Sequence, residues 1–348
     1  MTLALAAMGL AAAGSVAYSV RTYLRQFKPL VIRDVRCSHK NKPKAGAKPF
    51  PAEYSKAVAQ VAMAAMQATP LAYDYYHAPA DTRGDLPSLR RRLAKTLGAY
   101  LRKHVDPKGR VTNLDVAFSV NRANTCAVMA TVSCSAGGGV VVCLPATRDN
   151  RNWATNLRMA PRDAQMWLGK GAVGSVHSGI VLAYRSVRQR IYKYLKCNAS
   201  PRLPVLVCGH SLGGGLATLA AYDITRVGYS AVGYSIGPPR IGNAAMVDDF
   251  NKKVHGYHWF TTEGDPITRT GPRHLGYRHV KGGIIVNVEN AEKNTCPAKP
   301  RYSPCRTFTD HPRARGPMGR DPRVCQRQHT RATYEMVITG CDDPSRQY

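Results

Sequence analysis

The stretch PVLVCGHSLGGGLATLAAYDI, from Pro204 to Ile224, constrains the fold more than any other part of the chain. Its first residues are apolar and β-branched, which is typical of a buried strand. The segment Leu216–Ile224 is rich in Ala and Leu and predicts a helix. Between them, Gly209 and Gly213 flank Ser211 as Gly-x-Ser-x-Gly, the pattern of a strained strand-to-helix turn. This turn indicates either an exposed serine nucleophile or a purely structural bend.

Strands and helices are expected to alternate along most of the chain. The predicted strands are Val116–Val120, Ala127–Val132, Gly139–Cys143, Pro204–Cys208, Ala231–Ile236, Tyr257–Thr262 and Gly283–Val288. The predicted helices are Ala52–Thr69, Leu86–Val105, Ser178–Lys196, Leu216–Ile224 and Asn243–Val254. This alternation predicts an α/β protein with a central, mostly parallel sheet flanked by helices. The helix at Leu86–Val105 carries leucines on one face and basic residues elsewhere, so it either packs on the core or lies on a membrane.

The chain is strongly basic. Its 348 residues include 50 Lys and Arg against 21 Asp and Glu, a formal net charge of +29. Such a surface attracts anionic membranes, nucleic acid or other polyanions, unless it only reflects the genome or the surroundings of the protein. The sequence lacks interleaved aromatic and basic residues of the kind that bind nucleic acid, so nucleic acid is not an expected partner. The apolar share of 44% excludes a chain that is disordered throughout.

The amino terminus predicts delivery to a membrane or export. The segment Leu3–Val20 is uncharged and apolar, and Arg21, Arg25 and Lys28 follow it. It is short for a spanning helix, which needs about 20 residues, and long for the core of a signal peptide. We therefore expect a signal peptide or membrane anchor over residues 1–28, a basic linker over 29–51 and the folded domain over 52–348. The protein would be secreted or membrane-anchored.

The 10 cysteines fit an exported chain that forms disulfides. Two close pairs, Cys126 with Cys134 and Cys296 with Cys305, are expected in turn-like surroundings. Cys143 and Cys208 end apolar strands and are predicted to be buried thiols. The sequence leaves the connectivity open.

A serine nucleophile needs a base, and the base needs an acid that orients it. On an α/β-hydrolase-like sheet these residues follow one another as Ser, acid and His. Asp265, in WFTTEGDPITRTGP, comes just after a predicted strand, where ligands meet such sheets. Glu263 is its competitor, and an Asp-Pro turn is the structural alternative.

Five ordered motifs resemble the class 3, or fungal-type, triacylglycerol lipase family. They are VHSGIVLAYRSVRQRI from Val176, the stretch around Ser211, GYSIGPPRIGN from Gly233 to Asn243, DPITRTGP from Asp265, and LGYRH ending at His279. The likeness covers about Val116–His279 and continues more weakly to Cys341. It implies an α/β-hydrolase fold with a lid segment, with Ser211 as nucleophile and Asp265 as the acid of a catalytic triad. It implies no metal and no cofactor.

The resemblance also implies an oxyanion hole and a lid. The N–H of Leu212, directly after the nucleophile, is one expected donor. The other comes from the loop that reads Pro145-Ala146-Thr147, where the family usually has Arg-Gly followed by Ser or Thr. Alignment through Trp153 places Thr147 at the donor position. Arg148–Trp153 would then begin the lid, where Trp153 either covers the acyl pocket or is an ordinary surface residue.

Four histidines follow the acid. His329 is followed by Tyr334 and Cys341, as the catalytic histidine is in fungal-type members, and the family pattern suggests a bond from Cys341 to Cys37. His311, in TFTDHPRARG, is the alternative base. His274 follows the acid too closely, and the family counterpart of His279 is structural. His177 and His210 flank motifs but are expected to orient backbone or pack beside the turn.

These observations predict a serine lipase or esterase that hydrolyses acyl esters of triacylglycerol or phospholipid through an acyl-enzyme. Two alternatives stay open. The first is an A1-type phospholipase acting on anionic membranes, which the net charge favours. The second is a catalytically silent, basic binding protein built on a hydrolase scaffold. The expected partners are a lipid ester and a membrane surface, and the net charge favours an anionic one.

Overall fold

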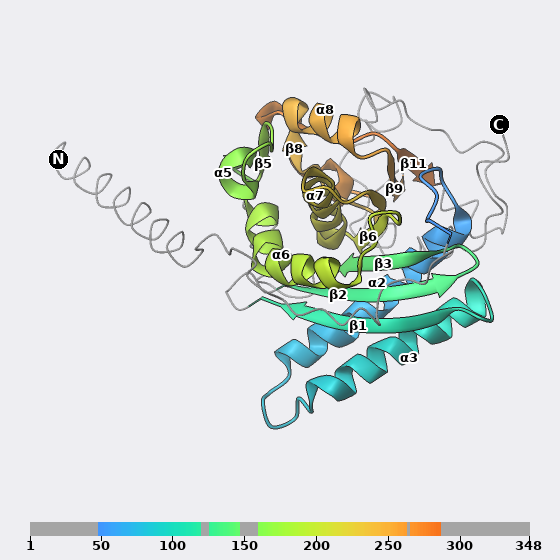
Figure 1. Cartoon of the computed structure of the whole chain (residues 1–348). Helices are drawn as coiled ribbons and strands as arrows, with labels where there is room; N and C mark the ends of the chain where they lie inside the picture. The colour runs from blue at the N-terminus through green and yellow to red at the C-terminus, as the bar shows by residue number, and fades with distance from the viewer. Residues whose placement is uncertain (1–47, 120–124, 147–158, 263–264, 287–348) are drawn as a thin grey trace, which may run out of the picture. The chain divides into compact units, whose positions relative to one another are not determined.

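A seven-stranded sheet forms the centre of the protein (Figure 1). The computed structural model describes residues 48–119, 125–146, 159–262 and 265–286, all within one compact unit. In spatial order the strands are β1 (Arg110–Phe118), β2 (Cys126–Cys134), β3 (Gly137–Leu144), β6 (Val205–His210), β7 (Ala231–Ile236), β9 (Gly256–Thr262) and β11 (Gly283–Val286). The first three strands pair antiparallel, and the rest of the sheet is parallel. The predicted α/β architecture with a mostly parallel sheet is confirmed.

Helices cover both faces of this sheet. They are α2 (Lys56–His77), α3 (Leu86–His104), α6 (Ser178–Asn198), α7 (Leu212–Arg226) and α8 (Ala244–Lys253). Figure 1 shows α2 and α3 on one side of the sheet and α6 and α7 on the other. The middle strands are buried on both faces and are therefore apolar nearly throughout, as parallel strands must be when helices cover both sides.

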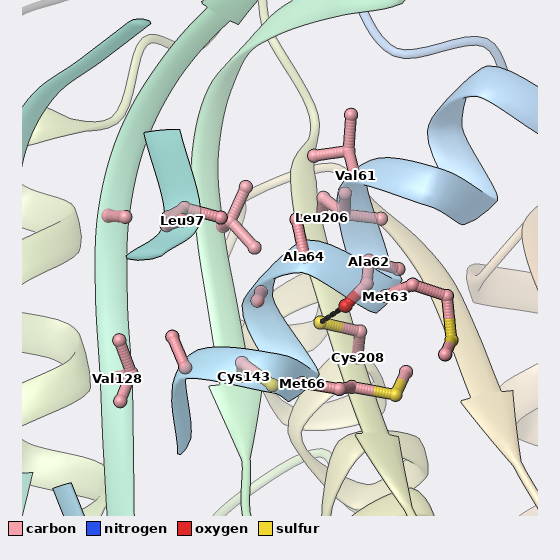
Figure 2. Close-up of a cluster of buried hydrophobic side chains, with 14 of the residues drawn as sticks. Val61, Ala62, Met63, Ala64, Met66, Leu97, Val128, Cys143, Leu206 and Cys208 are labelled. Carbon is pink, nitrogen blue, oxygen red and sulfur yellow. Dashed lines mark hydrogen bonds between the residues drawn. The ribbon is translucent and has the colours of Figure 1, made fainter. Parts of the chain in front are cut away.

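The core beneath α2 is built from small and flexible apolar side chains (Figure 2). Met63 and Met66 of α2 are buried there, and Cys143 of β3 lies in register with Cys208 of β6. The Cys208 thiol donates to the carbonyl of Ala62 at 3.7 Å. Alanines along α2 let this helix approach the sheet closely. Helix α2 packs on both β3 and β6, and β6 is the strand that leads to Ser211.

Helix α2 tolerates a proline in its interior. Pro70 has no N–H to donate to the carbonyl of Met66. The Thr69 hydroxyl donates to that carbonyl instead, at 2.9 Å. The helix therefore continues to His77, beyond the predicted end at Thr69.

The leucine face of α3 packs on the core. Leu89, Leu93, Leu97 and Leu101 are buried, against α2 and β1. Asp85 caps the amino terminus by accepting from the N–H of Ser88. Basic residues occupy the last turn, where their positive charge interacts favourably with the negative end of the helix dipole. Of the two interpretations of this helix, core packing is the one observed.

A second sheet escaped prediction because its strands are only two or three residues long. Its order is β10 (Tyr277–Arg278), β8 (Gly242–Asn243), β5 (Ser175–His177) and β4 (Pro161–Asp163), all antiparallel. The short helix α5 (Ala164–Leu168) follows β4, and two 3-10 turns, η2 (Ile267–Arg269) and η3 (Arg273–Leu275), precede β10. Strands this short carry no periodicity that a sequence pattern could register.

The predicted linker was wrong at its carboxyl end. Phe50 is 2% exposed and lies in the core, and the carbonyl of Lys48 accepts from the N–H of Gly138 at 2.9 Å. The ring of Phe50 lies where a side chain on Gly137 would clash. The folded domain therefore begins before residue 52.

The turn-like surroundings expected for Cys126 and Cys134 were also wrong. These residues begin and end β2, so the extended strand holds their thiols about 25 Å apart. Neither forms a disulfide bond, nor do Cys143 and Cys208, whose predicted burial is confirmed. Cys197 is disulfide-bonded.

The predicted signal or anchor, Leu3–Val20, lies outside the described residues. Among the helices that the structure does describe, none is both long and apolar enough to cross a membrane.

Replacing Leu97 with Ala should lower the free energy of unfolding by about 2–5 kcal/mol, because it empties a fully buried site between α3 and its neighbours. Leu275→Ala is the matched control, since Leu275 is 42% exposed and its loss should cost less than about 0.5 kcal/mol. Urea denaturation of the two variants measures the difference. Equal stability would contradict the burial of the α3 leucine face.

Candidate active site

Ser211 occupies the turn between β6 and α7. Its backbone has φ 58° and ψ −125°, and it is the one residue other than glycine with a positive φ in the part of the chain that the structure describes. A side chain in this region costs about 1–3 kcal/mol. The N–H of Ser211 donates to the carbonyl of Ile236 in β7 at 2.8 Å, which fixes the turn against the next strand. The predicted strand-to-helix turn is therefore observed, and α7 begins at Leu212, earlier than predicted.

The two glycines of the motif are required by contacts with backbone. A Cβ on Gly209 would lie 2.2 Å from the carbonyl oxygen of Gly213. A Cβ on Gly213 would lie 2.3 Å from the carbonyl oxygen of Leu144 and 2.5 Å from that of Pro145. The first turn of α7 thus rests directly against the end of β3.

This contact brings the expected oxyanion segment to the serine. Leu212 is the first residue of α7, where backbone N–H groups lack acceptors within the helix. Pro145 and Ala146 follow β3, and Pro145 approaches the same turn. Thr147 and Trp153 lie outside the described residues, so their expected roles stay predictions.

Asp265 follows β9 by a short turn and is 1% exposed. Its carboxylate accepts from the N–H of Ile267 at 2.8 Å, and its carbonyl accepts from the Thr268 hydroxyl at 3.1 Å. These bonds hold the carboxyl group at the start of η2. Glu263, the competing acid, lies outside the described residues.

Ser211 and Asp265 lie at the same edge of the sheet. They follow β6 and β9, which are parallel and separated only by β7, so the strand ends are about 10 Å apart. An imidazole placed between them could contact both side chains. His329 and His311, the two candidates for this base, are outside the described residues.

Two other histidines among the described residues make structural contacts. His177 caps α6, with its Nδ1 accepting from the N–H of Ile180 at 3.4 Å, as expected. His279 stacks on Trp259, and its Nε2 lies 2.7 Å from the carbonyl of Thr268. Burial, together with the charge of Arg240, lowers the pKa of His279 to about 3. The ring is therefore neutral near pH 7, and its interpretation as a structural residue is confirmed.

A buried ionic cluster at the far end of α7 was missed. Asp223 is fully buried, and its carboxylate accepts from Arg188 at 2.6 Å, Arg226 at 2.8 Å and the Tyr184 hydroxyl at 2.9 Å. Its charge raises the pKa of Arg188, although burial opposes this shift. The cluster ties α6 to the helix that carries Ser211. The signal in the sequence was a single Asp within the apolar run LATLAAYDI.

The motif GPPRIGN also positions the site. A Cβ on Gly214 would lie 3.1 Å from Pro238, and one on Gly215 would lie 2.8 Å from Pro239. This loop therefore packs on the first turns of α7. Arg240 is 4% exposed, and one guanidinium nitrogen donates to the carbonyls of Arg269 at 2.7 Å and Gly271 at 3.2 Å. Arg240 therefore links this loop to the segment that follows Asp265.

No group of His, Cys, Asp or Glu within the described ranges has the arrangement to hold a metal ion.

Part of the chain is similar to one family of hydrolases. Residues 141–274, which include Ser211 and Asp265, match the family model described as Lipase (class 3). The resemblance to class 3 lipases drawn from the motifs is therefore confirmed over this stretch, and with it the α/β-hydrolase type of fold.

Individual relatives match smaller shares of the chain. The secreted mono- and diacylglycerol lipase 1 of Fusarium solani is 31% identical over 142 residues, which cover 40% of this chain and 41% of the relative. Phospholipase A(1) DAD1 of Arabidopsis thaliana is 34% identical over 116 residues, covering 30% of this chain and 26% of the relative. The chain thus matches less than half the length of these relatives.

Among solved structures, the chain is similar to the mono- and diacylglycerol lipase of Aspergillus oryzae. The identity is 21% and the TM-score is 0.48, with 70% of this chain and 81% of that chain covered.

Gly213→Ala should lower the free energy of unfolding by about 1–3 kcal/mol, since the added methyl group meets two backbone carbonyls that cannot rotate away. Gly98→Ala in α3 is the control, because its Cβ would meet only the movable end of Arg102 and Ala favours a helix. Thermal and urea unfolding compare the two variants. If the Gly213 variant were as stable as the Gly98 variant, the proposed contact between α7 and β3 would be wrong.

Proposed function

We propose that this protein hydrolyses acyl esters of lipids, with Ser211 as the nucleophile. The observation that carries the proposal is the left-handed backbone of Ser211 at the junction of β6 and α7. Backbone strain of this kind gathers at functional sites, and a helix amino terminus stabilises negative charge that develops beside it. The match to the class 3 lipase model and the names of the relatives support a lipid ester as substrate.

The proposed reaction uses a triad. His329, or His311 in its place, takes the proton from the Ser211 hydroxyl as the oxygen attacks the ester carbonyl carbon. Asp265 holds the imidazole in orientation, and the N–H groups of Leu212 and Thr147 stabilise the oxyanion. The histidine then protonates the leaving alcohol. A water molecule, activated by the same histidine, releases the fatty acid from the acyl-enzyme and restores Ser211.

A phospholipase of the A1 type is the second candidate. The net charge of +29 favours a substrate presented on an anionic surface, and one relative carries the name of a phospholipase A(1). Trp153, at the start of the expected lid, would cover the acyl chain in either case. Faster hydrolysis of phospholipid in anionic vesicles than in neutral vesicles at low salt would favour this candidate over a neutral-lipid lipase.

We also propose that the chain is secreted. Residues 1–28 would act as a signal peptide, with a membrane anchor as the alternative, and a basic linker would follow. The first relative is named as a secreted lipase, and the disulfide-bonded Cys197 fits an oxidising compartment.

Ser211→Ala should reduce hydrolysis of nitrophenyl butyrate and nitrophenyl palmitate at least about a thousandfold, because the nucleophile is lost. Ser186→Ala is the matched control, since that hydroxyl donates to the Ala183 carbonyl within α6 and should be dispensable. The rates are measured with and without lipid vesicles, and circular dichroism verifies folding. A preference for the long acyl chain in the presence of vesicles would indicate a lipase, and a preference for the short chain would indicate an esterase.

Equal and negligible rates from the folded wild type and the Ser211 variant would contradict the proposal. The chain would then be a catalytically silent, basic binding protein on a hydrolase scaffold.

A further inference from the structure

The segment after Asp265 carries positive charge at the active-site edge of the sheet. Over residues 265–286, Asp265 is the only acidic residue, and it is buried. We name Arg269, Arg273, His274, Leu275 and Arg278 the arginine surface; they lie in η2, η3 and β10. All except Arg269 are exposed, and Arg269 is partly buried.

The positive charges of this surface are held close together. The buried guanidinium of Arg240 donates to the carbonyls of Arg269 and Gly271, which fixes the backbone between η2 and η3. Arg278 donates from Nη1 to the carbonyl of Tyr277 at 2.9 Å. Burial, together with the charges of Arg273, Arg278 and Arg269, lowers the pKa of Arg240 to about 10. The fields of all four arginines therefore overlap.

An apolar side chain accompanies these charges. Leu275 is 42% exposed and lies between Arg273 and Arg278 in the sequence, at the end of η3. Cationic side chains that flank an exposed leucine match the interface of an anionic bilayer, where phosphates meet acyl chains. The ring of Tyr277 is buried, so the arginine surface offers no exposed Phe, Tyr or Trp ring for stacking a nucleic-acid base, and the imidazole of His274 is its exposed ring.

We propose that the arginine surface docks the protein on anionic phospholipid bilayers. This proposal deepens the proposed function and rests on it for its purpose. Arg269 follows Asp265 closely in the chain, at the edge of the sheet where Ser211 also lies. Docking there would turn the active-site edge toward the lipid, and the electrostatic attraction would raise the local concentration of substrate.

A second basic region among the described residues is less suited to docking on an anionic bilayer. Arg90, Arg190 and Lys193 line a cleft of about 350 Å³ between α3, β1 and α6. Asp115 lies in the same cleft, 2.5 Å from a nitrogen of Arg90 and 4.0 Å from one of Arg190, so its carboxylate offsets part of their charge. The cleft adjoins β1, the edge strand, whereas the site lies beyond the ends of β6 and β9.

The test measures vesicle binding separately from catalysis. Full-length protein carrying Ser211→Ala is sedimented with vesicles of phosphatidylglycerol and phosphatidylcholine, or of phosphatidylcholine alone, at low and high salt. Arg273→Glu with Arg278→Glu should weaken binding to the anionic vesicles by at least about tenfold. Arg92→Glu with Arg102→Glu is the matched control, because it changes the net charge equally at exposed positions of α3. It should change binding by less than about twofold.

A second variant distinguishes a loss of binding from a loss of the fold. Leu275→Asp leaves every arginine in place and should also weaken binding to anionic vesicles, and circular dichroism confirms the fold of each protein. With Ser211 intact, all three variants should hydrolyse a soluble short-chain ester at the wild-type rate.

Equal losses in the arginine-surface and α3 variants would overturn the proposal, because the net charge alone would then explain the attraction. Binding to a DNA duplex but not to the anionic vesicles would overturn it in favour of a nucleic-acid surface. In a further outcome, the wild type binds vesicles through the arginine surface and yet hydrolyses esters no faster than the Ser211 variant. That result would refute the proposed function and support the docking surface.

Discussion

The close approach of α7 to the end of β3 is the contact on which the candidate site depends. It exists because Gly213 has no side chain where the first turn of α7 meets the end of β3, and Gly209 has none where β6 meets that same turn. Any Cβ there would push the helix away from the sheet. The same approach holds Ser211 in a left-handed conformation and brings Leu212 beside the segment that follows Leu144. One steric constraint thus positions both the proposed nucleophile and Leu212, an expected oxyanion donor.

The strain at Ser211 is balanced by rigid packing elsewhere along α7. Pro238 and Pro239 pack against the first turns of the helix, and the Asp223 cluster fixes its last turns to α6. On the opposite face of the sheet, α2 covers β3 and β6. Because a packed core resists small displacements, this support lets the turn keep a conformation that costs about 1–3 kcal/mol.

The sequence allowed the parts with strong local patterns to be predicted. Ala231–Ile236 was expected as a strand and is β7 with the same ends, because a buried parallel strand is a short apolar run between polar loops. The turn at Ser211 was predictable because a strained strand-to-helix turn leaves no room for a side chain at its two glycine positions. Asp265 was found because it follows a strand at the active-site edge.

Other features depend on tertiary contacts that leave little local trace. The second sheet has strands too short for any period, and Phe50 lies in the core although it ends a basic, proline-containing stretch. Cys126 and Cys134 are near in sequence but extended in space. For the proposed base, more than one histidine after Asp265 fits the order Ser, acid, His, so spacing alone left His329 and His311 as alternatives.

The most direct measurement of the central claim is the site of covalent labelling by a fluorophosphonate. This reagent phosphonylates serines that are activated as nucleophiles. After digestion, mass spectrometry should find the adduct on the peptide that contains Ser211, and Asp265→Asn should slow its formation by at least about tenfold. A folded protein that forms no adduct, or forms it on another serine, would contradict the assignment of Ser211 as the nucleophile.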